Sequence, residues 1–307
     1  MQIRTLRIGT RGSPLARAQA EEVARRLRDV HRRSGIAVAI VPIRTTGDRQ
    51  ADRPLADAGG KGLFTKEIEE ALLAGDVDIA VHSAKDMPTV LPPGLVLAGC
   101  LPREDARDAF IGRNAASLAD LPQGATLGTS SLRRRAMALH IRPDLRIVEF
   151  RGNVGTRLGK LKDGVADATL LAMAGLRRLG LADRATAILD AAVFVPAVGQ
   201  GAIAVELREG DNPTRELVAP MLDADTGFAI EAERAFLAAL DGSCRTPIGG
   251  HAVVANGMLT LHGIIVTPDG RTAHEAERRG AVGNAARLGR EAGEELVRRG
   301  GPDFFRH

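Results

Sequence analysis

The stretch Leu6-Arg7-Ile8-Gly9-Thr10-Arg11-Gly12-Ser13-Pro14 decides the fold class of this chain. Residues 6–9 have the pattern of a short β-strand. Residues 10–14 predict a tight turn that ends in an N-cap Ser, with Pro at the first helical position. We expect a helix over Leu15–Leu27 and a second strand, rich in β-branched residues, over Ala37–Arg44. A strand, a tight turn and a helix in this order are typical of an α/β lobe.

A second copy of this pattern occurs in the middle of the chain. Leu127-Gly128-Thr129-Ser130-Ser131-Leu132 has the same order of strand, Gly-Thr, hydroxyl residue and helix, and the helix is expected from Arg133. The junction between a strand and a helix N-terminus is where α/β proteins bind anions, through free N–H groups and the helix dipole. The repeat therefore predicts two similar lobes with anion sites, although ordinary N-capping also explains each Ser.

Between these motifs lies a polar, glycine-rich segment, residues 45–62, which predicts a mobile loop of the kind that covers a site. A helix is expected from about Leu63 to Gly75, followed by a strand over Asp78–His82. Strands that alternate with helices over short connections predict a doubly wound, largely parallel sheet.

The sequence changes character from about residue 220. A helix is expected over Phe228–Leu240, and strands over Ala252–Val254 and Leu259–Val266, joined by the hairpin signal Asn256-Gly257. The predicted fold class is therefore α/β, with two doubly wound, periplasmic-binding-protein-like lobes around a cleft and a smaller C-terminal α+β domain. We expect domain 1 to comprise residues 1–101 and 201–219, domain 2 residues 102–200, and domain 3 residues 220–307.

Composition narrows the class of protein. The chain has 307 residues, 44% of them hydrophobic and 26% charged, as in soluble globular proteins. It has no signal-peptide core and no apolar run near the roughly 20 residues that span a bilayer, so we expect a soluble, cytoplasmic protein without membrane partners. The two cysteines, Cys100 and Cys244, argue against a disulfide scaffold.

The charge balance favours an anionic small molecule as the ligand. The formal net charge is +4, but aromatic residues make up only 3%, with no Trp or Tyr, so base-stacking surfaces are not expected. No helix-turn-helix or zinc-finger spacing occurs either. A nucleic-acid-binding function would rest on the basic charge alone, and no metal site is expected.

Three groups of residues carry candidate chemistry. Cys244 lies in the loop sequence Asp241-Gly242-Ser243-Cys244-Arg245-Thr246-Pro247, where nearby basic residues favour a thiolate, although the local sequence alone favours a structural cysteine by about two to one. Lys85 and Asp86 follow a predicted strand, which places them at a binding crevice unless they form a solvated surface pair.

The third group is a set of arginines. Like charges crowded at a helix start oppose the helix dipole, which suggests a compensating anion held by guanidinium groups. Arg135 and Arg177 are expected on a solvated face. The set comprises Arg133, Arg134, Arg135, Arg151, Arg157, Arg177 and Arg178.

Taken together, these motifs resemble the porphobilinogen deaminase family, also called hydroxymethylbilane synthase. The resemblance covers nearly the whole chain in order. Its motifs are Gly9–Ala16 (GTRGSPLA), Gly59–Phe64 (GGKGLF), His82–Asp86 (HSAKD), Gly128–Arg134 (GTSSLRR), Arg151–Arg157 (RGNVGTR) and Pro196–Gly201 (PAVGQG).

The resemblance implies a monomeric transferase with three domains and a dipyrromethane cofactor joined by a thioether to Cys244. Four porphobilinogens would be condensed head to tail with loss of ammonia, and 1-hydroxymethylbilane would be released by hydrolysis, as a step of tetrapyrrole (haem) biosynthesis. Loss of the amine would leave an azafulvene-like cation. Asp86 is the expected catalytic residue, because a carboxylate near the pyrrole N–H groups would stabilise that cation and assist proton removal.

The resemblance also assigns binding roles, because each pyrrole brings an acetate and a propionate. Residues expected to hold the cofactor are Ser83, Lys85, Thr129, Ser131, Arg133 and Arg134. Residues expected to bind the substrate and growing chain are Arg11, Ser13, Arg151, Arg157, Arg178 and Gln200, with Lys61 and Phe64 in the lid.

The chain departs from many relatives at Ser243 and Thr246, where they read Gly-Gly-Cys-x-Val-Pro, and at Asp57, where some carry a basic residue. The main alternative is a binding protein, because two similar lobes with an anion cleft also describe solute receptors and sensor domains. Cys244, Asp86 and the lack of a signal peptide favour the enzyme.

Overall fold

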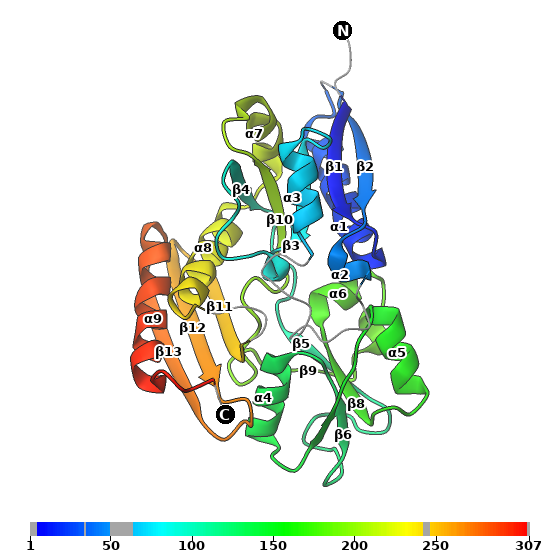
Figure 1. Cartoon of the computed structure of the whole chain (residues 1–307), viewed down its shortest axis with the longest axis vertical. Coiled ribbons are helices and arrows are strands. Elements are labelled where there is room, and N and C mark those ends of the chain that lie inside the picture. Colours follow the sequence, from blue (N-terminus) through cyan, green and yellow to red (C-terminus); the bar gives the residue numbers. More distant parts are fainter. Residues whose placement is uncertain (1–4, 34, 50–63, 242–245, 306–307) are drawn as a thin grey trace. The chain divides into compact units, whose positions relative to one another are not determined.

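The computed structural model describes residues 5–33, 35–49, 64–241 and 246–305 (Figure 1). The chain divides into two compact units, each treated separately here. Unit 1 comprises Met1–Glu104 and Ala202–Gly227, and unit 2 comprises Asp105–Gly201 and Phe228–His307. The chain therefore leaves unit 1 after residue 104 and returns to it at residue 202. The predicted domain boundaries, and the cleft predicted between the lobes, stay predictions.

Unit 1 is built on a five-stranded sheet in the order β2-β1-β3-β10-β4. Strand β1 pairs in parallel with β2 and β3, whereas β10 runs antiparallel to both β3 and β4. The strands are β1 (Thr5–Arg11), β2 (Ala37–Ile43), β3 (Ile79–Ser83), β4 (Leu95–Cys100) and β10 (Ile203–Arg208).

The two longer helices of this lobe, α1 and α3, cover the sheet because each has an apolar face. Val23 and Leu27 of α1 are fully buried against Leu6 and Ile8 of β1, whereas Ile68 of α3 belongs to a separate small core. The helices are α1 (Pro14–Val30), α2 (Thr46–Arg49), α3 (Lys66–Leu73), α7 (Asn212–Val218) and the 3₁₀ turns η1 (Ala84–Asp86) and η3 (Ala219–Met221).

The predictions for this unit are largely confirmed. The predicted helix over residues 15–27 is present and longer, and the predicted strands over residues 37–44 and 78–82 are shifted or shortened by one residue. The predicted loop over residues 45–62 is wrong at residues 46–49, which form the short helix α2. The backbone N–H of Thr46 donates to Glu67 Oε1 (2.7 Å), an interaction with a distant residue that local composition does not indicate. Residues 50–62 lie outside the described residues.

Unit 2 contains a sheet with the same arrangement, in the order β7-β6-β8-β5-β9. Strand β6 is parallel to β7 and β8, and β5 is antiparallel to β8 and β9. The strands are β5 (Asp108–Gly112), β6 (Thr126–Gly128), β7 (Arg146–Val148), β8 (Ala168–Ala172) and β9 (Ala187–Ile188), and the helices are α4 (Leu132–Ile141), α5 (Val154–Lys162), α6 (Met173–Arg178) and η2 (Ala182–Arg184).

The two lobes thus have the same topology, which confirms the internal repeat. In each sheet the strand that begins the repeated motif, β1 or β6, occupies the second position. The strand in the fourth position, β10 or β5, runs antiparallel to its neighbours. The repeated glycines hold equivalent places, because Gly9 pairs with Ala80 of β3 and Gly128 pairs with Thr169 of β8. A Cβ on Gly128 would lie 2.6 Å from the Phe150 ring, so this strand requires glycine there.

The C-terminal part of unit 2 is a three-stranded antiparallel sheet covered by two helices, α8 and α9 (Figure 1). Its elements are α8 (Ala224–Ala239), β11 (Ile248–Ala255), β12 (Met258–Val266), β13 (Ala273–Ala281), η4 (Val282–Asn284) and α9 (Ala285–Gly300). The predicted hairpin turn is confirmed, since Asn256 (φ 52°) and Gly257 (φ 72°) both adopt the left-handed conformation.

Phe236 of α8 is fully buried and explains why β12 carries a glycine opposite it. A Cβ on Gly263 would lie 2.5 Å from the Phe236 ring. We therefore expect Gly263→Ala to lower the free energy of unfolding by about 1–3 kcal/mol, because overpacking a dense core forces side chains from their rotamers.

The matched control is Gly159→Ala in α5, where an added Cβ would meet no atom within 4 Å. It should gain up to about 1 kcal/mol from the higher helix propensity of alanine. Urea unfolding of both variants and the wild type measures the two effects. Equal stability of Gly263→Ala and the wild type would contradict the packing argument.

Candidate functional site

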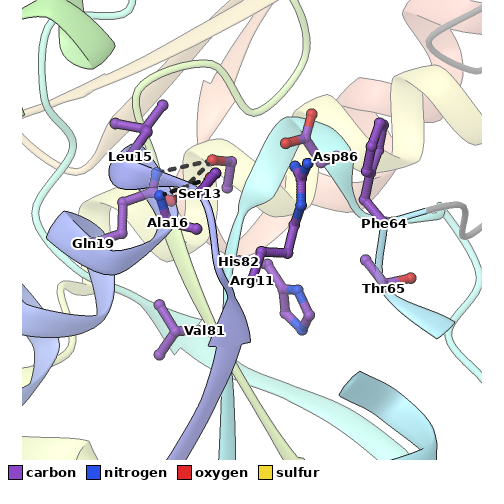
Figure 2. Close-up of a pocket in the computed structure, with 11 residues that line it drawn as sticks. Arg11, Ser13, Leu15, Ala16, Gln19, Phe64, Thr65, Val81, His82 and Asp86 are labelled. Carbon is purple, nitrogen blue, oxygen red and sulfur yellow. Dashed lines mark hydrogen bonds between the residues drawn. The ribbon is translucent and has the colours of Figure 1, made fainter. Parts of the chain in front are cut away.

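Unit 1 contains a pocket at the carboxyl ends of β1 and β3 (Figure 2). Four elements or segments supply its walls: the end of β1, the first turns of α1, the end of β3 with η1, and the residues that precede α3. The lining residues are Arg11, Ser13, Leu15, Ala16, Gln19, Phe64, Thr65, Val81, His82, Ser83 and Asp86.

The turn between β1 and α1 positions Arg11 and Ser13. The Ser13 hydroxyl caps α1 by accepting from the Ala16 N–H (3.3 Å), and Pro14 occupies the first turn. The Thr10 hydroxyl is fully buried and donates to Ala16 O and Val81 O (3.3 and 3.4 Å). These bonds hold the β1 end to both α1 and β3, and Arg11 follows directly.

Arg11 and Phe64 form one wall of the pocket. The Arg11 guanidinium carbon lies 4.1 Å from the centroid of the Phe64 ring, a cation–π contact that holds the charged group in place. Phe64 was predicted as a lid residue. Lys61, the other predicted lid residue, lies outside the described residues.

The end of β3 places Asp86 in the same pocket. The chain leaves the sheet at Ser83 and makes one 3₁₀ turn, in which Ala84 N–H donates to Ala202 O (3.0 Å). Ser83 is fixed by Gln19, with side-chain distances of 2.8 and 3.1 Å. Asp86 and Arg11 both reach the pocket (Figure 2), whereas Lys85 is half-buried and does not line it.

In unit 2, Arg133 and Arg134 form a buried ion-pair cluster with Asp108. Asp108 is 0% exposed, and each of its carboxylate oxygens lies 2.7 Å from one of the two guanidinium groups. Each arginine also donates to a backbone carbonyl: Arg133 to Val195 O (2.7 Å) and Arg134 to Leu170 O (3.0 Å). Burial alone would raise the pKa of Asp108, but the positive charges of Arg133 and Arg134 outweigh burial and lower it to about 2.

Other predicted binding residues support this cluster. Gln200 is buried, and its amide donates to Ala106 O (2.6 Å) and Asp108 Oδ1 (3.2 Å). The Thr129 hydroxyl accepts from the Ser131 N–H (3.1 Å), and the Ser131 hydroxyl accepts from the Arg134 N–H (3.4 Å) at the start of α4. Their predicted roles in cofactor or substrate binding stay predictions.

Arg134, Arg151 and Arg157 form a basic group at the ends of α4 and α5. Arg151 and Arg157 are half-buried, and the pKa of Arg157 is lowered to about 10, first by burial and then by the charges of Arg134 and Arg151. Burial and the repulsion from Arg134 and Arg151 both disfavour the charged form of Arg157, and a bound anion would offset both. Arg157 Nε donates to Gly152 O (2.9 Å), and Arg151 pairs with Glu149 (3.0 Å).

The remaining arginines differ in exposure. Arg178 donates to Gly201 O (2.9 Å) and is half-buried. Arg135 and Arg177 are exposed, as predicted, and Arg177 pairs with Asp105 (3.3 Å).

Two features escaped the sequence analysis. Asp108 opens an apolar strand, Asp108–Gly112, and a charged residue at that place was the available signal for a buried partner of the arginines. The second feature is a buried group of Glu69, His82 and Glu206 beside the pocket, in which Glu206 of β10 comes from a part of the chain far from α3 and β3. No spacing in the chain indicates it.

Some residues lie outside this account. Cys244 is outside the described residues, whereas Cys100 is buried in β4. Among the described residues, no group of three or more His, Cys, Asp or Glu side chains could hold a metal ion. In the same part of the chain, no helix is long and apolar enough to cross a membrane.

Asp108→Asn tests the buried cluster. Removing the carboxylate leaves two guanidinium groups buried without their counter-ion, so we expect a loss of about 3–5 kcal/mol in the free energy of unfolding. Because folding lowers the pKa of Asp108, its contribution is present above 3.8 and is lost as pH falls toward about 2.

Denaturant unfolding between pH 2 and pH 6 measures both effects. The stability difference between Asp108→Asn and the wild type should shrink as pH falls through that window. Asp163→Asn, at the exposed C-cap of α5, is the control and should follow the wild type. A difference that stays constant with pH would contradict the ion-pair account.

Comparison with known proteins identifies the family. The family model "Porphobilinogen deaminase, dipyromethane cofactor binding domain" matches residues 6–216, and "Porphobilinogen deaminase, C-terminal domain" matches residues 228–298. The porphobilinogen deaminases of Nitrobacter winogradskyi and Nitrobacter hamburgensis are each 58% identical over 298 residues, which cover 97% of this chain and 94% of theirs.

Among solved structures, a putative methionine-binding lipoprotein from Bacillus subtilis matches with a TM-score of 0.43 and 12% identity, over 71% of this chain and 89% of its own. That likeness is too weak to carry an argument. The two family models and the 58% identity are decisive, and the resemblance seen in the sequence is confirmed. This chain belongs to the porphobilinogen deaminase family.

Proposed function

We propose that this protein is a transferase that condenses four porphobilinogens head to tail, with loss of ammonia, and releases 1-hydroxymethylbilane by hydrolysis. The observation that carries the proposal is the pocket of unit 1, where Asp86 meets Arg11 and Ser13 at the carboxyl ends of β1 and β3. A carboxylate and an arginine in one pocket suit a substrate that carries both an amine and carboxylates.

Within that pocket we assign the reacting role to Asp86. Departure of ammonia leaves positive charge on the substrate pyrrole, which a nearby carboxylate stabilises, and the same carboxylate can take up the proton released from carbon. Arg11 and Ser13 are assigned to the substrate carboxylates. The contact between Arg11 and Phe64 keeps the guanidinium in place before substrate arrives, which lowers the entropy cost of binding.

The residues present also fit the dipyrromethane that the family model names. Its acetate and propionate groups require cations. Arg134 and Arg151 are close enough to Arg157 to lower its pKa, so these three arginines offer such cations together. Arg133 Nε is buried and has no hydrogen-bond partner among the described residues. When bound, the cofactor supplies the pyrrole α-carbon on which the chain is built.

The attachment and the binding roles are proposals about named residues. We assign the thioether to Cys244, and binding of the cofactor to Ser83, Lys85, Thr129, Ser131, Arg133 and Arg134. We assign the growing chain to Arg151, Arg157, Arg178 and Gln200, with Lys61 and Phe64 in the lid. For Arg133, Arg134 and Gln200, the contacts with Asp108 support a role in holding the basic group together. The monomeric state and the cytoplasmic location also remain proposals.

The alternative, a solute receptor or sensor domain, rests on resemblance of fold alone. It gives no reason for Asp86 to share a pocket with Arg11, and the family match favours the enzyme.

Intact mass of the denatured protein tests the covalent cofactor. We expect the wild type to carry a mass excess of one dipyrromethane and Cys244→Ser to lack it, because only the thiolate can form the thioether. Cys100→Ala is the matched control and should keep the excess, since Cys100 is buried in the sheet. An unmodified wild type whose mass is also unchanged after addition of porphobilinogen would contradict the proposal.

Asp86→Asn tests the catalytic assignment. The variant should keep the fold and the cofactor mass, but lose kcat by about 10²-fold or more, because the amide can neither offset the cation nor accept the proton. Asp163→Asn should keep the wild-type kcat. Near-normal turnover in Asp86→Asn, with porphobilinogen consumption measured at saturating substrate, would remove Asp86 from this role.

A further inference from the structure

Beside the pocket of unit 1 lies a buried group that the mechanism above does not use. Glu206 of β10 is 0% exposed, and His82 of β3 and Glu69 of α3 are each 5% exposed. We call these three residues the acid cluster. His82 Nε2 lies 3.1 Å from Glu206 Oε2. Two carboxylates and one imidazole are therefore withdrawn from water within one lobe.

Strand pairing explains how the cluster forms. His82 lies opposite Ala204 in the antiparallel pair of β3 and β10, and Glu206 is two residues further along β10. Alternate residues of a strand share one face of the sheet, so Glu206 and His82 lie on the same face. Helix α3 packs against the sheet through Ile68 and Leu72, next to Ala80 of β3, and Glu69 comes from this helix.

The cluster is electrically neutral only if it holds protons. With His82 neutral and both carboxylates ionised it would carry two negative charges in a buried place, which is costly. Two bound protons remove that charge. The pKa of Glu69 is raised, first by burial and also by the negative charge of Glu206, although Thr65 and His82 act in the opposite direction.

Unsatisfied oxygens support the same conclusion. Glu69 Oε1 and Glu206 Oε1 are buried and have no hydrogen-bond partner among the described residues. Buried polar atoms without partners are rare, and both atoms here are acceptors when ionised. A proton on Glu69 removes one of these ionised acceptors and with it one of the buried negative charges.

The cluster communicates with the pocket through His82, which belongs to both. His82 lines the pocket together with Arg11 and Asp86, and Thr65, at the N-cap of α3, lines it as well (Figure 2). A change of charge in the cluster therefore acts on the pocket through one ring. The charged and titratable groups that act on Glu69 or line the pocket are Glu206, His82, Glu70, Arg11 and Asp86.

We propose that His82 is a positioning residue for the condensation: Glu206 holds its ring in the pocket wall, and a proton retained on Glu69 keeps a second buried negative charge away from the reacting groups. This inference rests on the proposed function of the pocket. Ionisation of Glu69 at higher pH places an uncompensated charge behind His82, disturbs the ring and lowers turnover.

The first test is the pH dependence of kcat in Glu69→Gln, which cannot ionise. The wild type should lose activity by up to tenfold for each pH unit above the titration of Glu69, as its protonated fraction falls. The ratio of wild-type to Glu69→Gln kcat should fall with the same slope. Glu70→Gln, one residue away on the exposed side of α3, is the control: it keeps an ionisable Glu69, so its kcat should still fall with pH, from a slightly lower pH because the Glu70 charge raises the pKa of Glu69. Wild-type and Glu69→Gln profiles of identical shape would overturn the proposal.

The second test is Glu206→Met, a side chain of similar size that cannot replace the 3.1 Å hydrogen bond to His82 Nε2. We expect kcat to fall by about tenfold to hundredfold, because small misplacements at a reacting centre are costly, and KM to change less than twofold, because arginines bind the substrate carboxylates. A kcat within twofold of the wild type, or a rise in KM alone, would overturn the positioning role.

A measurement without substrate separates this inference from the proposed function. Folding raises the pKa of Glu69 above its ordinary 4.5, so its stabilising effect is full below 4.5 and is lost as pH rises through the raised value. The wild type and Glu70→Gln should lose stability across this window, and Glu69→Gln should not. An equal slope in Glu69→Gln would overturn proton retention. Failure of the wild type to consume porphobilinogen would instead reject the proposed function, and with it the positioning role.

Discussion

The second lobe depends on a single buried carboxylate, Asp108, which holds two arginines of the next helix. Desolvating three charged groups is expensive, and the cost is offset only because both carboxylate oxygens are paired and further guanidinium donors reach carbonyls. The cluster joins β5, the start of α4, β8 and the segment before β10 at one point. Arg134 belongs both to this cluster and to the basic group with Arg151 and Arg157, so the buried cluster and the basic group are physically continuous.

The two lobes use the same backbone for different chemistry. In both, a Gly-Thr pair ends a parallel strand and a serine caps the next helix. In unit 1 the antiparallel strand β10 contributes a carboxylate, Glu206, that pairs with a histidine. In unit 2 the equivalent strand β5 contributes a carboxylate, Asp108, that pairs with arginines. The two acids are not at equivalent positions, because Glu206 lies opposite Ala80 near the start of β3, whereas Asp108 lies opposite Ala172 at the end of β8.

Much of the fold could be predicted because its signals are local. Ser13-Pro14 indicates a helix start, Asn256-Gly257 a hairpin, and the repeat of Gly-Thr a second lobe, since each depends on backbone geometry within a few residues. The sequence predicted Lys85 and Asp86 at a binding crevice because side chains at the carboxyl ends of parallel strands point there; Asp86 lines the pocket of unit 1, whereas Lys85 does not. Helix α2 and the partner of the arginines did not follow, because Thr46 meets Glu67 and Arg133 meets Asp108 across long separations in sequence.

The sequence by itself determined the class of fold and the family, because motifs such as Gly128–Arg134 are contiguous and specific. Only the tertiary structure decided which of the motif residues line a pocket and which form ion pairs or hydrogen bonds with other residues of the chain. Arg133 and Gln200 carry the same functional groups whether buried or exposed, and strand pairing and helix packing place Asp108 within reach of both. The acid cluster arises in the same way, since α3, β3 and β10 must pack together before Glu69, His82 and Glu206 are buried side by side. Only then does the protonated form of Glu69 have a lower free energy than the ionised form.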